Sequence, residues 1–69
     1  MLSKLEIDIL RACNGEIVQL PYDAEQRRAS GRLTVMGLIV NTMEDDQPTA
    51  YITDPGKLAL ETFRNAPQA

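Results

Sequence analysis

The sequence contains no histidine and only one cysteine, Cys13. Without histidine, neither a serine–histidine–aspartate triad nor a cysteine–histidine pair can form, and no imidazole is present to bind zinc. A single cysteine cannot make an internal disulfide. Because Cys13 falls on an apolar helical stripe, we interpret it as a small core residue rather than a nucleophile. We therefore expect no enzymatic activity, no cofactor and no metal.

Long apolar runs are also missing. No segment approaches the roughly 20 consecutive apolar residues of a membrane span. Glu6, Asp8 and Arg11 interrupt the apolar residues near the N-terminus, which argues against a signal peptide. A lone cysteine suits the reducing cytosol. These features predict a cytoplasmic protein without membrane association.

The small size limits how the chain can be stabilised. Its 69 residues make one domain, predicted over residues 1–64, with a frayed tail at 65–69. Such a short chain buries only about 60% of its unfolded surface. Since disulfide and zinc staples are excluded, stability must come from well-packed helices or from oligomerisation.

Charge is unevenly distributed along the chain. The net charge of −3 argues against non-specific nucleic-acid binding, which depends on neutralising phosphates. However, three of the seven basic residues lie within residues 22–40, and no acid occurs between Gln26 and Met43. The negative charge gathers further on, at Glu44, Asp45 and Asp46. Distribution matters more than the sum for a binding surface.

The first segment predicts a helix over residues 4–13. Ser3 and Glu6 fit a capping box at its start, and Asn14-Gly15 suits its C-terminal end. Ile7 lies beside the main apolar stripe, so it is either buried or exposed to a partner. The stripe comprises Leu5, Ile9, Ala12 and Cys13, with Leu10 at its edge. Residues 16–20, which are β-branched at their centre and followed by Pro21, predict a brief strand.

A second helix is predicted over residues 23–36, capped by Asp23 and ended by Gly37. One face should pack on the first helix: Tyr22, Gln26, Ala29, Leu33 and Met36. The opposite face presents Ala24, Arg27, Arg28, Gly31 and Val35. Glycine in a helix interior costs about 1 kcal/mol relative to alanine. Gly31 is either a tolerated defect or a point where another backbone, of protein or DNA, approaches closely.

The rest of the chain predicts a hairpin and a last helix. Strands over residues 38–43 and 49–53 flank a polar loop over 44–48. Thr53 or Asp54 then caps a helix whose buried side is supplied by Leu58, Ala59, Thr62 and Phe63. The predicted fold class is α+β and mostly helical, in the order helix, strand, helix, β-hairpin, helix.

Three motifs in this order resemble the winged-helix family. Its first helix is similar to Leu2-Ser3, Glu6, Ile9-Leu10 and Gly15. The end of its recognition helix, entering the wing, is similar to Arg32-Leu33 and Gly37-Leu38-Ile39. Its second wing strand and C-terminal helix are similar to Tyr51-Ile52-Thr53, Gly56 and Ala59-Leu60. Only about sixteen residues separate Leu20 from Gly37, so this would be a reduced winged helix whose second helix is short or missing.

The resemblance implies a small transcriptional regulator that contacts double-stranded DNA through helix 23–36. Arginines at the outward face would meet phosphates or guanine edges in the major groove. The implied nucleic-acid-binding residues are Arg27, Arg28, Gly31, Arg32, Thr34 and Val35. A homodimer is expected, since a monomer contacts little DNA. Candidate dimer contacts are Ile7, Val35 and Val40.

The alternative is a protein-interaction module or inhibitor on the same scaffold, of a type common among phage-encoded proteins. Many winged helices bind proteins. Independently of this, the arginines could be a solvated helix surface paired with Asp23, Glu25 or the acidic loop. The acidic loop at residues 44–46 favours this alternative, because a wing tip that approaches phosphate tends to be basic.

Overall fold

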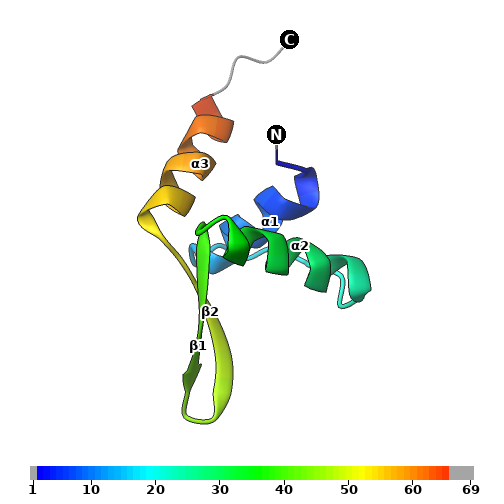
Figure 1. Cartoon of the computed structure of the whole chain (residues 1–69). Coiled ribbons are helices and arrows are strands. Elements are labelled where there is room, and N and C mark those ends of the chain that lie inside the picture. Colours follow the sequence, from blue (N-terminus) through cyan, green and yellow to red (C-terminus); the bar gives the residue numbers. More distant parts are fainter. Residues whose placement is uncertain (1, 66–69) are drawn as a thin grey trace.

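A computed structural model describes residues 2–65 as three helices and one antiparallel hairpin. The α+β class is therefore confirmed. In Figure 1 the hairpin projects to one side of the helices. Among the described helices, none has the length and apolar character to cross a membrane. The elements are α1 (Lys4–Cys13), α2 (Ala24–Val35), β1 (Ile39–Glu44), β2 (Gln47–Ile52) and α3 (Asp54–Asn65).

A side chain caps the N-terminus of each of the three helices. The Ser3 hydroxyl accepts the Glu6 N–H at 3.2 Å, and the Glu6 carboxylate accepts the Ser3 N–H at 2.9 Å, which confirms the capping box. Asp23 accepts the Gln26 N–H at 2.9 Å. Thr53 caps α3 by accepting the Gly56 N–H at 3.1 Å. The predicted helix starts are therefore correct.

Glycines in left-handed conformation end the first two helices. Gly15 has φ 90° and Gly37 has φ 77°. After α2, the Gly37 N–H bonds to the Thr34 carbonyl and the Leu38 N–H to the Leu33 carbonyl, both at 3.0 Å. This paired arrangement satisfies carbonyls that the helix leaves open and turns the chain directly into β1.

The core is small and lies where α1, α2, α3 and the base of the hairpin meet. Leu10 and Leu33 are fully buried at its centre, although Leu10 was predicted only at the edge of the α1 stripe. Ile7 is buried, so it is not available as a dimer contact. Cys13 packs against this core and is half-buried. The buried apolar residues are Ile7, Ile9, Leu10, Ala29, Leu33, Ile39 and Leu60.

Four apolar side chains predicted to be buried are exposed instead. Tyr22, at 97% exposure, precedes the first turn of α2, so a helical wheel does not place it. Met36 follows the last turn of α2 and is half-exposed. Leu58 lies on the opposite side of α3 from its buried Gly56 and Leu60, and Phe63 near the helix end is 43% exposed.

The strand predicted over residues 16–20 does not form. Residues 16–22 have no regular secondary structure, and Ile17 is fully exposed. An isolated strand leaves its N–H and C=O groups unpaired, and the two strands of the sheet pair only with each other. The order is therefore helix, helix, strand, strand, helix. No helix lies between residues 15 and 23, where the winged-helix pattern would place its second helix.

The hairpin is longer and its turn tighter than predicted. Its register runs from Ile39 opposite Ile52 to Glu44 opposite Gln47. Only Asp45 and Asp46 form the turn, with φ values of 50° and 63°. The predicted five-residue loop is therefore a two-residue turn with positive φ at both positions. The backbone twist of such a turn matches the twist of the two strands that it joins. The predicted tail at 65–69 lies outside the described residues apart from Asn65, which ends α3.

Gly56 fixes α3 against the base of the hairpin. It is buried in the first turn of α3, directly over the Leu38 carbonyl. A Cβ at this position would collide with that carbonyl oxygen and lie 2.7 Å from Ile52 Cγ1. The Leu38 carbonyl also accepts the Thr53 N–H at 3.0 Å, so it cannot easily move aside.

Gly56→Ala should lower the free energy of unfolding by about 3 kcal/mol because of this overlap. Gly31→Ala is the matched control, since no atom lies within 4 Å of its added Cβ. That control should raise stability by about 1 kcal/mol through helix propensity. Urea denaturation of the two variants tests this, and equal effects on the midpoint would show that α3 does not need the close approach.

Candidate functional site

The outward face of α2 carries exposed basic and apolar side chains. Arg27, Arg28, Gly31 and Val35 lie opposite the buried Ala29 and Leu33, and all four are exposed. Val35 is 88% exposed. Within residues 2–65, neither Arg27 nor Arg28 forms an ion pair, including with Asp23, Glu25 or the acidic turn. Both guanidinium groups are thus available to a partner.

Arg32 is drawn away from this face. Its Nε lies 3.6 Å from a carboxylate oxygen of Glu6, which is itself only 7% exposed. The pair places Arg32 on the flank of α2 that faces α1. Its charge is therefore partly neutralised within the chain, and the pair links the start of α1 to the C-terminal half of α2.

Thr34 lies on the other flank of α2. Its hydroxyl donates to the Ser30 carbonyl at 3.0 Å and accepts the side-chain amide of Asn41 at 2.9 Å. Asn41 belongs to β1, so this bond sets the hairpin against α2. The six predicted binding residues thus divide into four on one outward face and two, Arg32 and Thr34, that position the helix.

Sequence reasoning missed Glu6 and Asn41 as partners of this helix. Glu6 is 26 positions before Arg32, and its place in a capping box gave a complete local explanation for it. Asn41 lies in β1, and nothing in the sequence except its polarity marks it as a partner of α2. Only the packing of α1 and β1 on either side of α2 brings them into contact with it.

A groove runs between the N-terminal end of α1 and the C-terminal half of α2. Its volume is about 750 Å³, and its walls are mostly apolar. The Glu6–Arg32 pair lies in it. The lining residues are Leu2, Glu6, Gly31, Arg32, Val35 and Met36.

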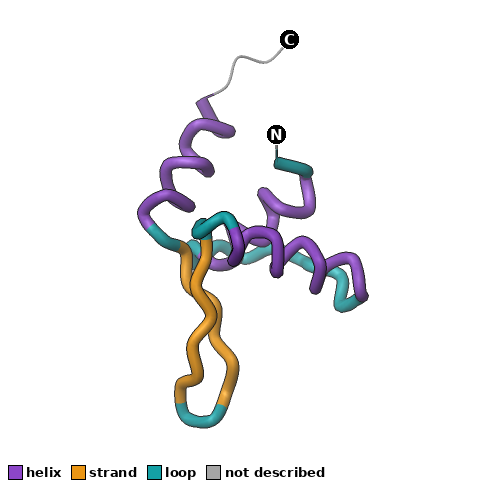
Figure 2. Tube along the Cα trace, viewed as in Figure 1, coloured by secondary structure: helices purple, strands orange, loops and turns teal. Residues whose placement is uncertain are grey.

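The hairpin does not extend the positive face of α2. From Ile39 to Ile52 it contains no basic residue, and its turn carries Glu44, Asp45 and Asp46, all exposed. In Figure 2 the turn lies at the end of the hairpin remote from the helices. The acidic turn therefore neither neutralises the arginines of α2 nor joins them in one positive strip.

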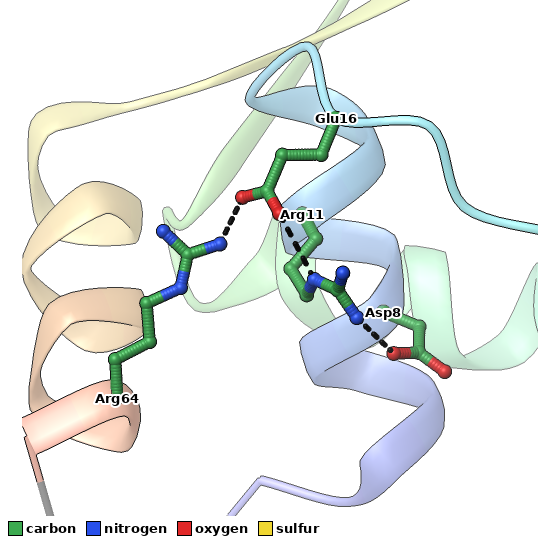
Figure 3. Close-up of polar contacts among 4 residues, drawn as sticks. All are labelled: Asp8, Arg11, Glu16 and Arg64. Atoms are coloured by element: carbon green, nitrogen blue, oxygen red, sulfur yellow. Dashed lines mark hydrogen bonds and ion pairs between the residues drawn. The ribbon is translucent and has the colours of Figure 1, made fainter.

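A second set of charges joins α1, the following segment and α3 (Figure 3). Arg11 lies 3.5 Å from Asp8 and donates to Glu16 at 3.1 Å. The other carboxylate oxygen of Glu16 accepts from Arg64. This network anchors the irregular segment after α1. Together with Arg32 it uses three of the seven basic residues for internal pairing.

Hydrogen bonds and ion pairs within the chain lower the pKa of two glutamates, Glu6 and Glu16. The Ser3 N–H that bonds to Glu6, helped by Arg32, lowers the pKa of Glu6 although burial opposes the change. Hydrogen bonds from Arg11 and then Arg64 lower the pKa of Glu16. Burial raises the pKa of the Cys13 thiol, which suits a packing role and not a reactive one.

Comparison with protein-family models, curated proteins and solved structures finds no match to this chain. The winged-helix resemblance therefore stays a prediction from the motif residues.

The two lowered carboxylates predict a loss of stability in acid. A carboxylate with a depressed folded-state pKa stabilises the fold above its ordinary pKa of 4.5, and this contribution is lost as the pH falls through the folded-state value. Denaturant midpoints should therefore decrease below pH 4.5. In the double variant Glu6→Gln/Glu16→Gln, the denaturant midpoint should decrease less steeply with falling pH than in the parent chain. Gln at position 6 still completes the capping box. Glu61→Gln, an exposed α3 position, is the control, and an unchanged slope in the double variant would contradict the assignment.

Proposed function

We propose that this chain is a small DNA-binding protein of the winged-helix type, acting as a transcriptional regulator, and that the outward face of α2 contacts the duplex. The observation that carries the proposal is the pair of exposed arginines beside an open glycine on this face. Arg27 and Arg28 are without ion-pair partners in residues 2–65, so binding would not require any internal contact to break.

The dimensions and the mounting of α2 favour this use. Its 12 residues span about 18 Å, and the major groove of DNA admits a helix. Gly31 has open space where other residues carry a side chain, so a phosphate backbone could approach α2 closely there. Glu6 and Asn41 contact the two flanks of α2 and leave the outward face clear.

The contact would be confined to α2. The acidic turn of the hairpin would be repelled by phosphate, so the hairpin would serve as a brace for α2 and not as a second DNA contact. Two arginines neutralise few phosphates, and the expected affinity is accordingly modest and salt-sensitive.

Arg27→Gln/Arg28→Gln should reduce affinity for a short mixed-sequence duplex on the order of tenfold at low salt, because counterion release from two phosphates is lost. The slope of log affinity against log salt should fall by about 2. Fluorescence anisotropy with labelled DNA measures both. The matched control, Lys4→Gln/Lys57→Gln, removes the same charge from exposed positions on α1 and α3 and should bind as the parent chain does. Absence of binding at micromolar protein, or equal loss in both variants, would disprove the proposal.

Gly31→Ala separates binding from stability. It should raise the melting temperature by several degrees for a domain this small, through helix propensity. It should also weaken DNA binding, because the added methyl group occupies the point of close approach. A variant that is more stable and binds DNA with unchanged affinity would show that Gly31 is merely a tolerated defect.

The acidic hairpin supports a second candidate, a protein-interaction module. Three exposed carboxylates at the end of a projecting hairpin suit a basic protein surface. In that case reversing the charges of Glu44, Asp45 and Asp46 would weaken capture of the partner, whereas the arginine variants would leave it unchanged. DNA binding predicts the opposite pattern.

A further inference from the structure

The charges of α2 and its N-cap come close to cancelling. The arginines are Arg27, Arg28 and Arg32, and the acids are Asp23 and Glu25. Three positive charges against two negative ones leave a surplus of one. Glu6 of α1 offsets that surplus, because its carboxylate lies 3.6 Å from Arg32 Nε. Whether α2 presents a net positive charge to an anion therefore depends on Glu6.

Arg32 lies at the edge of the outward face of α2. It follows Arg28 by four positions, so the two side chains start from neighbouring points on the helix surface, about 5–6 Å apart at Cβ. Gly31, where no atom lies within 4 Å of an added Cβ, directly precedes it. The side chain of Arg32 is 54% exposed, so solvent reaches it. A change of rotamer toward Arg28 would extend the basic face without moving the helix.

The Glu6 carboxylate is fixed in place and cannot follow Arg32. One of its oxygens accepts the Ser3 N–H at 2.9 Å, and the residue is only 7% exposed. That hydrogen bond and Arg32 lower the pKa of Glu6, so it is ionised at neutral pH. If Arg32 turned to a phosphate, Glu6 would lose its only ion-pair partner within residues 2–65. A buried charge without a partner is costly, which favours retention of the guanidinium by Glu6.

We propose that Glu6 is an affinity-determining residue of the α2 face, which withholds Arg32 from an anionic partner and so limits how many phosphates the chain neutralises. The inference rests on the proposed function, since the partner is a DNA duplex. In the parent chain Arg27 and Arg28 make the phosphate contacts alone. Removing the negative charge of Glu6 releases Arg32 as a third contact beside Arg28.

Fluorescence anisotropy with the short mixed-sequence duplex tests this. Glu6→Gln should raise the affinity on the order of fivefold at low salt and steepen the slope of log affinity against log salt by about 1, the contribution of one phosphate. Glutamine still completes the capping box, and circular dichroism checks that the variant is folded. Glu61→Gln removes the same charge from an exposed position on α3 and should leave the slope unchanged.

A double-mutant cycle separates the release of Arg32 from a general change in charge. Arg32→Gln in the parent chain should leave the slope unchanged, because Arg32 does not contact phosphate there. In the Glu6→Gln background the same substitution should remove the whole gain in slope and affinity. A gain that persists without Arg32 would come from weaker repulsion alone and would overturn the inference. A lower affinity in Glu6→Gln would also overturn it, since Glu6 would then orient Arg32 for the contact.

The parent chain decides the proposed function separately. If the parent binds and Glu6→Gln has the same slope, only the role of Glu6 is overturned and the DNA contact stands. If neither chain binds at micromolar protein, both proposals are overturned. Binding by Glu6→Gln but not by the parent would support the role of Glu6 and would show that the parent chain does not use this face for DNA.

Discussion

The close contact of Gly56 with the Leu38 carbonyl governs the arrangement of the molecule. It lies where α2, the hairpin and α3 converge, next to the left-handed Gly37. The Thr53 hydroxyl donates to the Gly37 carbonyl at 2.6 Å while also capping α3. A single junction therefore ends one helix, closes the base of the hairpin and starts the next helix, so the direction of every later element depends on it.

The domain compensates for a small core with specific polar contacts at its edges. Within residues 2–65, seven buried apolar residues form that core, and the single cysteine forms no disulfide there. Glu6 links the start of α1 to α2 through Arg32, and Glu16 links α1 to α3 through Arg11 and Arg64. Exposed ion pairs contribute little individually. Their effect here is on geometry, since each pair favours one orientation of the helices that it links.

The same pairing decides which charges remain for binding. Within residues 2–65, Arg27 and Arg28 form no ion pair, because α2 packs on α1 and β1 through its buried face and its flanks and not through its outward face. Asp45 and Asp46 form no ion pair within residues 2–65, because the hairpin extends beyond the core. The outward face of α2 therefore presents the basic groups on which the proposed DNA contact depends, and the hairpin turn presents acidic ones.

Local signals in the sequence determined the helices and their ends. The Ser3–Glu6 box, the Asp23 and Thr53 caps and the glycines after α1 and α2 act within a few residues, so they could be recognised without a structure. The α+β class followed from their order. The strand predicted at residues 16–20 failed because a strand needs a partner, and β propensity cannot supply one.

Tertiary structure alone decided how the predicted site divides. Arg27, Arg28, Gly31 and Val35 share a face that helical periodicity already defined. That Arg32 turns to Glu6 and Thr34 to Asn41 depends on how α1 and β1 pack beside α2. Such contacts join residues distant in the chain, whose proximity arises only when the core closes. The sequence thus determined which side chains α2 carries, and the packing of its neighbours determined which of them remain free to bind.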